Sequence, residues 1–313
     1  MISRLRPHLA PAAALAGLGL LFVYFYATSR GPSRAVPAAA TAEAVMIEAY
    51  FTSPEESEAT ALRGGPDAAV ARSIDQARET VDMAMYELNL WSIRDALLRA
   101  QARGVDVRMV MEKDSMFARE VRALVEAGIP IAADTDEGLM HDKFVVVDGG
   151  EVWTGSMNLT VTDAYYNNNN LIRFRSDAIG RAYTGEFEEM FVDGWFGMLS
   201  TPGGGAQTQD GRIAAYFSPD DGAALRLDEL LDQARSSIEV MAFAFTSESI
   251  AEAILERAAA GVRVRIVMDE DQAANLGSQY GRFLEAGLDV RLDGNPNKMH
   301  HKVIIIDGAI VVT

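Results

Sequence analysis

The stretch MHDKFVVVD at residues 140–148 returns further along the chain as MHHKVIIID at residues 299–307. Each copy places a histidine, a lysine two positions later and an aspartate five positions after that, around an uncharged β-branched run. Such a run, followed by Asp-Gly, predicts a buried strand that enters a hairpin. Residues two apart in a strand point to the same side, so we expect the histidine and lysine to present together.

Other segments repeat with nearly the same offset, which stays between 157 and 166 residues. GVDVRMVM at 104–111 returns as GVRVRIVM at 261–268, and YFTSP at 50–54 returns as YFSP at 216–219. This offset indicates a duplicated unit of about 160 residues rather than the short period of a solenoid.

Each unit alternates helical and strand patterns, which predicts the α/β fold class with mixed sheets in two tandem repeats. Helical spacing covers 70–81 and 227–238, and apolar strand runs are predicted at 81–86, 105–111, 238–245 and 262–268. The helices between these strands are expected to open with Ser92-x-x-Asp95 and Ser249-x-x-Glu252, which resemble capping boxes. They should end before Gly104 and Gly261.

The N-terminus carries a membrane signal. Residues 9–27 hold no charge and follow Arg4 and Arg6, and 19 such residues can span a bilayer as a helix. We interpret 1–30 as an uncleaved signal anchor, with a cleaved signal peptide as the alternative. The catalytic body is then expected to be membrane-anchored and extracytoplasmic (periplasmic or cell-surface), or secreted if the segment is cleaved.

The remaining boundaries follow from composition and from the repeat. Residues 31–45, rich in Ala, Pro and Ser, are predicted to be a linker. The first repeat is expected over 46–200, a Gly-rich linker over 201–211 and the second repeat over 212–313.

Composition excludes several kinds of chemistry. The 313 residues include no cysteine, which rules out disulfides, thiolate metal sites and a cysteine nucleophile. Net charge is −17, and outside the first 30 residues 25 basic residues face 45 acidic ones. Such a surface repels nucleic acid at long range. Only four lysines occur, and two of them lie in the repeated motif together with three of the four histidines.

An imidazole beside an ammonium is a poor structural pair, because each disfavours the charge of the other. The pairing makes sense if both groups face an anion. Lysine then neutralises oxygens while histidine attacks or donates a proton. A phosphodiester needs these functions, and two such pairs supply them without a metal.

Gly155-Ser156-Met157-Asn158 follows the first motif, so the constellation reads His-x-Lys-x4-Asp-x6-Gly-Ser-x-Asn. Over about residues 46–313 the chain resembles the phospholipase D superfamily. The resemblance implies two repeats packed about a pseudo-twofold axis, with both motifs in one metal-independent, cofactor-free site that acts through a phosphohistidine. It implies these site residues: catalytic His141, Lys143, Asp148, His300, Lys302 and Asp307, and substrate-binding Ser156, Asn158 and Asn169.

Within that set the family pattern suggests His141 as nucleophile and His300 as general acid, although the sequence itself does not distinguish them. Both lysines would hold phosphate oxygens, and the two aspartates look like orienting or turn residues.

The sequence departs from the family pattern in two ways. The chain stops at Thr313, before a second Gly-Ser-x-Asn, and we interpret it as truncated at the C-terminus. Many relatives also carry a glutamate in an Asn-x-Glu-Asn run, where it orients the nucleophilic histidine. Asn169 stands at that place here, and an amide stabilises an imidazolium less than a carboxylate does.

The favoured function is a phospholipase D-type phosphodiesterase that hydrolyses phospholipid head groups, with phospholipid or another phosphodiester and the membrane as partners. An endonuclease of the same superfamily is the main alternative, although the acidic body makes nucleic acid an unlikely partner. A cardiolipin-synthase-like phosphatidyl transferase is a variant of the first function. A non-catalytic phosphate-binding membrane protein is the least favoured alternative.

Overall fold

The computed structural model describes residues 45–135, 138–197, 206–209 and 212–313. The predicted anchor, nearly all of the linker that follows it and most of the 201–211 linker lie outside these ranges. Within them, no helix combines the length and the apolar character needed to cross a membrane. Residues 43–313 group into one compact unit, so the two predicted repeats pack against each other.

The first repeat is built on a seven-stranded mixed sheet in the order β1-β7-β6-β5-β2-β3-β4. Strands β2, β3 and β4 run parallel, whereas β5, β6, β7 and β1 are added with antiparallel pairings. The strands are β1 (Met46–Phe51), β2 (Thr80–Met85), β3 (Asp106–Glu112), β4 (Ile131–Asp134), β5 (Lys143–Val147), β6 (Glu151–Gly155) and β7 (Asn170–Arg175).

The second repeat reproduces five of these strands in the order β12-β11-β10-β13-β14, with the same parallel and antiparallel pairings as β4-β3-β2-β5-β6. The mixed α/β fold with a duplicated sheet is therefore confirmed, and the pseudo-twofold axis stays a prediction. The strands are β10 (Ser237–Ala242), β11 (Arg263–Met268), β12 (Asp289–Leu292), β13 (Lys302–Ile306) and β14 (Ile310–Val312). A separate small sheet pairs β8 (Ala206–Gln207) with β9 (Ala214–Ala215).

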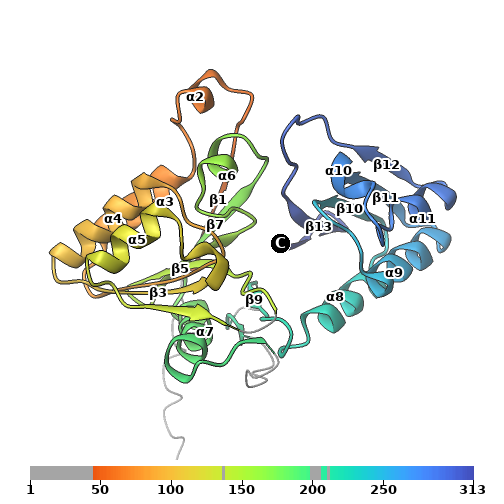
Figure 1. Cartoon of the computed structure of the whole chain (residues 1–313). Helices are drawn as coiled ribbons and strands as arrows, with labels where there is room; N and C mark the ends of the chain where they lie inside the picture. The colour runs from red at the N-terminus through yellow and green to blue at the C-terminus, as the bar shows by residue number, and fades with distance from the viewer. Residues whose placement is uncertain (1–44, 136–137, 198–205, 210–211) are drawn as a thin grey trace, which may run out of the picture. The chain divides into compact units, whose positions relative to one another are not determined.

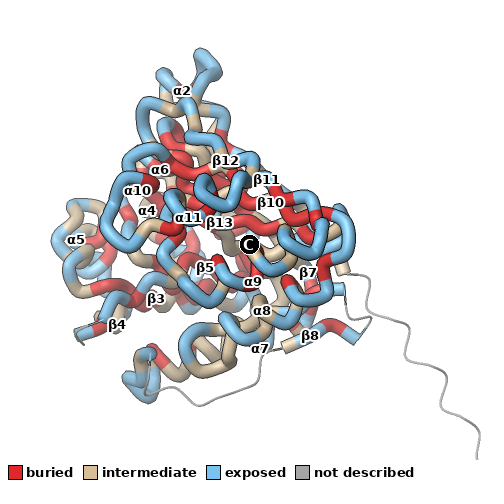
Figure 2. Tube along the Cα trace, turned by 90° about the vertical axis from the view of Figure 1, so that its right-hand side faces the viewer, coloured by how far each residue is buried: buried red, intermediate tan, exposed pale blue. Residues whose placement is uncertain are grey.

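Helices cover both faces of the first sheet (Figure 1). One face packs against α3 (Asp67–Gln76), α4 (Trp91–Ala102) and α5 (Arg119–Glu126), and the opposite face packs against α7 (Asp177–Glu188). In the second sheet, alternate residues of β10 pack against α8 (Ala223–Asp232), α9 (Glu248–Ala259) and α11 (Tyr280–Glu285). The buried residues concentrate in the strands, including β10, β13 and β5 (Figure 2).

Shorter elements complete the described chain. They are α2 (Ser57–Thr60), the 3-10 turn η1 (Lys113–Ser115), α6 (Val161–Tyr165), the π-helical turn η2 (Glu189–Asp193) and α10 (Glu270–Ala273).

The predicted helix starts were wrong in detail. Helix α4 begins after Leu90, without a side-chain cap, because the Ser92 hydroxyl donates instead to Asp67 at 2.6 Å. Helix α9 is capped by Ser247, two residues before the predicted Ser249, and the Ser247 side chain accepts from the N–H of Ile250. A serine followed by an acid three residues later therefore marked the neighbourhood of each start but not the capping residue.

The predicted first helices of each repeat were also too long. Helix α3 ends at Gln76 and α8 at Asp232, so Val81 and Ile238 lie in strands β2 and β10. Both side chains are fully buried. An apolar residue at the end of a helical pattern and one at the start of a buried strand look the same in sequence.

The two copies of the Tyr-Phe segment occupy different structural positions. Phe51 ends strand β1 of the first sheet, whereas Tyr216 and Phe217 lie outside the strands. The Phe217 ring lies 4.9 Å from that of Tyr183 on α7, so this part of the second repeat packs on the first. The contact brings both aromatic residues to the wall of the site described next.

Candidate active site

The repeated His-x-Lys motif adopts the same geometry in both repeats. Lys143 Nζ donates to the backbone carbonyl of His141 at 2.8 Å, and Lys302 Nζ donates to that of His300 at 2.9 Å. Each lysine is the first residue of its strand, β5 or β13. The backbone therefore holds each ammonium close to the histidine of its own motif.

An aromatic ring supports each motif from the adjacent central strand. The ring of Tyr86, just after β2, lies edge-on to His141 at 4.8 Å, and that of Phe243, just after β10, lies edge-on to His300 at 4.7 Å. The lysine of the same repeat lies over the same ring, at 5.2 Å and 4.9 Å respectively. Cation–π attraction therefore fixes both ammonium groups without neutralising them.

A buried carboxylate holds the residue before each histidine. Glu112, at the end of β3, accepts from the N–H of Met140 at 2.9 Å, and Asp269, just after β11, accepts from the N–H of Met299 at 3.0 Å. Both acids are essentially inaccessible to solvent. Sequence reasoning missed them, although VME and VMD occupy matching places at the ends of the duplicated strands.

The two motifs open into one cavity of about 850 Å³. His141, Lys143 and Ser156 line it from the first repeat, and Lys302 lines it from the second. His300 is buried and does not line it, but its charge acts on His141. The predicted convergence of both motifs on one site is therefore present in this structure. Its cationic side presents two ammonium groups and an imidazole to any bound anion.

Asn169 joins the two motifs, but through a different histidine from the one expected. Its Oδ1 accepts from Ser156 Oγ at 2.8 Å and lies 3.0 Å from Nδ1 of His300, so the predicted orientation of His141 was wrong. The cause is the path of the chain before β7. Asn168 forms an isolated parallel bridge with Met299, and its carbonyl accepts from the N–H of His300 at 2.9 Å.

The next asparagine makes an equivalent contact. Asn170 Oδ1 lies 2.9 Å from Nδ1 of His301, and its Nδ2 donates to Thr313 Oγ1 at 3.1 Å. His301 is buried, outside the cavity lining. Its ring lies edge-on to that of Phe51 at 6.2 Å, so His301 is a packing neighbour of the motif.

Gly155 is required by a close approach of two backbones. Its φ is +146°, and a Cβ at this position would lie 2.3 Å from the carbonyl oxygen of Asn170. The same carbonyl accepts from the N–H of Ser156 at 3.0 Å. Only glycine lets the end of β6 approach the start of β7 this closely.

The expected phosphate ligands divide into two groups. Lys143, Lys302 and Ser156 line the cavity, whereas Asn158 and Asn169 are buried and do not. The N–H of Asn158 donates to Asp163 at 2.8 Å, which ties its loop to helix α6. These two asparagines therefore organise the site from behind rather than at its surface.

The two aspartates of the motifs hold backbone turns, not reacting groups. Asp148 and Asp307 lie at the far ends of β5 and β13 from the histidines, with φ of +50° and +53°. Their carboxylates accept from the N–H groups of residues 78–80 and 235–237, respectively. The structure thus gives them a folding role, and we assign them none in the reaction.

The site lowers the pKa of all four basic groups. Burial and then the nearby lysine charge lower the pKa of His141 and of His300 to about 4. Burial lowers the pKa of Lys143 to about 8, and burial followed by the charge of Lys143 lowers that of Lys302 to about 7. Near neutral pH the imidazoles are unprotonated, so one of them is ready to act as a nucleophile.

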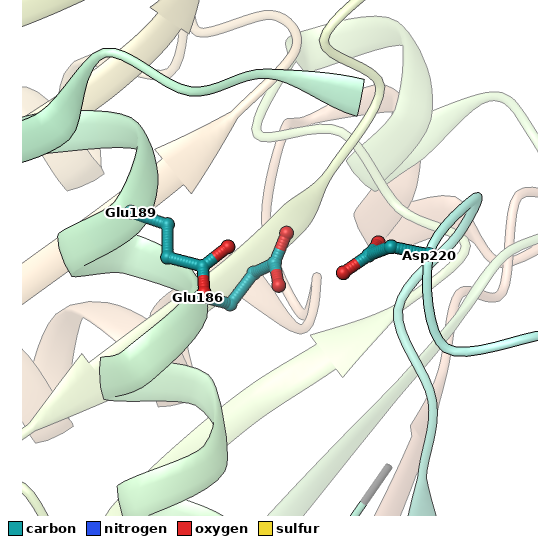
Figure 3. Close-up of side chains that lie close together, drawn as sticks. All are labelled: Glu186, Glu189 and Asp220. Carbon is teal, nitrogen blue, oxygen red and sulfur yellow. The ribbon is translucent and has the colours of Figure 1, made fainter. Parts of the chain in front are cut away.

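Three acidic residues lie close together beside the cavity, and one of them, Glu186, forms part of its wall. Glu186 and Glu189 project from α7 and the turn after it toward Asp220 on a facing loop (Figure 3), with carboxylate oxygens within 4.8 Å of one another. Burial and then the charge of Asp142 raise the pKa of Glu186 to about 8. Within the described ranges, this trio is the group whose oxygens could hold a divalent cation. That the reaction needs no metal stays a prediction.

Comparisons with known proteins agree with the duplicated fold. The family described as "Cardiolipin synthase, PLD-like domain" matches residues 70–191 and 227–313. The mitochondrial cardiolipin hydrolase of Xenopus tropicalis is 43% identical over 120 residues, which cover 38% of this chain and 57% of the relative. The phospholipase D of Rickettsia prowazekii is 28% identical over 134 residues, 42% of this chain and 62% of the relative.

The chain thus spans less than two thirds of either relative's length. Among solved structures, the polyphosphate kinase of Porphyromonas gingivalis is similar in fold, with a TM-score of 0.58 and 13% identity over 84% of this chain and 44% of that one.

Proposed function

This chain belongs to the family described as cardiolipin synthase, PLD-like domain, and on that premise we propose that it is a phospholipase D-type phosphodiesterase. One observation carries the proposal: His141 and Lys143 of the first motif and Lys302 of the second line a single cavity, and the buried His300 lies close enough to affect the pKa of His141. A phosphodiester held there meets a nucleophile, a proton donor and two ammonium groups at once.

The first step assigns His141 as nucleophile. Its imidazole lines the cavity, and no hydrogen bond ties its ring within the described part of the chain. The unprotonated nitrogen attacks phosphorus, a P–N bond forms, and the P–O bond to the leaving group breaks. Lys143 and Lys302 stabilise the negative charge on the non-bridging oxygens.

His300 donates the proton that the leaving oxygen takes up. Because Asn169 Nδ2 donates to the carbonyl of Asp163 at 3.1 Å, the Oδ1 of Asn169 faces His300 and accepts from its Nδ1. We assign the proton transfer to the other ring nitrogen; a hydrogen bond to the backbone of Ser156 also raises the pKa of this imidazole. In the second step it takes a proton from water, whose oxygen attacks phosphorus and releases His141.

Binding of the substrate anion should raise the pKa values of the histidines, which are lowered in the free site. The lysine charges lower the pKa of both histidines, and a phosphate placed between the lysines offsets those charges. His300 then acquires the proton that the first step needs. Protonation is thereby coupled to occupancy of the site.

We infer a phospholipid as the substrate rather than a nucleic acid. Relatives named cardiolipin hydrolase and phospholipase D support this choice. The charge of the body supports it as well, because a polyanion would meet acidic surface beyond the pocket. The uncharged run at 9–27 supports membrane anchoring of an exported body. An alcohol in place of water would turn the same intermediate into a transfer product.

A substrate panel tests the proposal. The chain is incubated with vesicles of phosphatidylcholine, with vesicles of cardiolipin and with single-stranded DNA at physiological ionic strength. We expect lipid turnover that is lost in His141→Ala and in His300→Ala and kept in Lys298→Gln, a control whose ammonium pairs with Asp271 outside the site. Efficient DNA cleavage without lipid turnover would instead establish the nuclease.

A further inference from the structure

The hydrogen bond that orients His300 supplies no counter-charge. Its acceptor is the neutral amide oxygen of Asn169, and an amide stabilises an imidazolium less than a carboxylate does. The site also concentrates positive charge, since Lys302 and Lys143 both lower the pKa of His300. A general acid in these surroundings needs a negative charge close by.

Asp163 on helix α6 lies immediately behind this contact. The residue is 4% exposed, and its carboxylate accepts from the N–H of Asn158 at 2.8 Å and from Asn167 Nδ2 at 2.5 Å. Its backbone carbonyl accepts from Nδ2 of Asn169, the residue that holds His300. Asp163 is therefore held by Asn158 on the N-terminal side of helix α6 and by Asn167 and Asn169 on its C-terminal side.

No lysine or arginine of the described ranges forms an ion pair with Asp163. Burying a carboxylate without a cationic partner is costly unless other charges compensate for it. The uncompensated charges close to it are those of the active-site motifs.

We propose that Asp163 is a positioning residue that supplies the counter-charge of the active site, in place of a carboxylate at the position of Asn169. The proposal rests on the phosphodiesterase function proposed above. In the family pattern the acid stands within the Asn-x-Glu-Asn run, and here it stands six residues earlier, on the helix that packs behind the run.

Electrostatics supports this assignment. Asp163 raises the pKa of His141, His300, Lys143 and Lys302, against the lowering caused by burial and by the two lysines. Each of the other nearby acids raises the pKa of only one of these four groups. Glu87 after β2 and Asp142 before β5 raise the pKa of Lys143, and Asp269 after β11 raises that of Lys302.

The test removes the negative charge of Asp163 and then restores a negative charge at a neighbouring position. Asp163→Asn and Asp163→Ser remove it, and the double variant Asp163→Asn/Asn169→Glu returns a carboxylate at the acceptor position. Asn167→Ala is the matched control, because it removes the Asn167 hydrogen bond to Asp163 but keeps the charge. Two readouts are measured: the pH profile of bis(p-nitrophenyl) phosphate hydrolysis and the pKa of the His300 ring by NMR.

In both neutral variants we expect two shifts of about one pH unit to lower pH: in the pH above which the hydrolysis rate falls, and in the pKa of His300. One nearby charge at protein-like dielectric changes a pKa by about that amount. The double variant should recover the wild-type positions, and Asn167→Ala should not shift them. If Asp163 has only a structural role, its replacement will lower the hydrolysis rate without moving the pH profile or the His300 pKa, and adding Asn169→Glu will not restore the rate. That result would overturn the proposal. The NMR titration needs no turnover, so it tests Asp163 even if the chain hydrolyses no phosphodiester.

Discussion

Replacing Lys302 with glutamine should remove most of the alkaline pH dependence of catalysis. Burial and the charge of Lys143 lower the pKa of Lys302 to about 7, while burial lowers that of Lys143 to about 8. Only the charged ammonium attracts phosphate, so kcat/KM falls as the pH rises through these values. The direction follows because a lowered lysine pKa brings loss of charge into the neutral range.

The magnitude follows from the two protonated fractions. A group with a pKa of about 7 is roughly 90% charged at pH 6 and roughly 10% charged at pH 8. If both lysines must be charged, kcat/KM of the wild type falls about twentyfold between these pH values. In Lys302→Gln only Lys143 remains, and the fall shrinks to about twofold. The variant also loses one charge-assisted contact, so its kcat/KM at pH 6 should lie at least about tenfold below wild type.

The assay is initial-rate hydrolysis of bis(p-nitrophenyl) phosphate from pH 5.5 to about 9, with p-nitrophenol read after an alkaline quench so that its own ionisation does not matter. Lys298→Gln is the control, because that lysine pairs with Asp271 and should keep the wild-type profile. An unchanged twentyfold fall in Lys302→Gln would refute the reasoning, as would a flat wild-type profile.

Three further outcomes are expected. Gly155→Ala should lower the free energy of unfolding by at least about 2 kcal/mol, because its Cβ would lie 2.3 Å from the Asn170 carbonyl oxygen. Gly128→Ala, also at positive φ but in open space, is the control and should lower it by about 1 kcal/mol. Equal decreases for the two variants in urea unfolding would contradict this prediction. Asp148→Ala should lower the free energy of unfolding by about 1–2 kcal/mol through three lost backbone contacts, and a shifted pH profile of hydrolysis would show that its role is not purely structural. Activity should survive EDTA, and loss that one divalent ion restores would point to the Glu186, Glu189 and Asp220 trio.

The duplicated motif made much of the fold and site predictable. Strands at β5 and β13 followed from their β-branched runs, and shared placement of histidine and lysine followed from strand periodicity. The repetition of the motif in matching strands of two similar sheets predicted that both copies contribute to one site.

What the sequence did not reveal depends on contacts between distant segments. Glu112 and Asp163 are single acids in an acidic chain, and nothing local distinguishes them from surface residues until burial and partners are known. The histidine that Asn169 reaches depends on how the loop before β7 pairs with the second repeat. Helix starts at Leu90 and Ser247 were missed because tertiary contacts, such as that of Ser92 with Asp67, outweigh a local capping pattern.

The most direct test of the proposed mechanism is the covalent intermediate itself. His300→Ala is mixed with a phosphodiester substrate, quenched at alkaline pH to preserve phosphoramidates, and analysed by intact-protein and peptide mass spectrometry. With bis(p-nitrophenyl) phosphate as the substrate, the leaving p-nitrophenolate needs no proton, so the first step can proceed without His300. We expect a p-nitrophenyl phosphoryl adduct on His141 in this variant, absent from His141→Ala, because the second step lacks its general base. Turnover by His141→Ala, or an adduct confined to another residue, would contradict it.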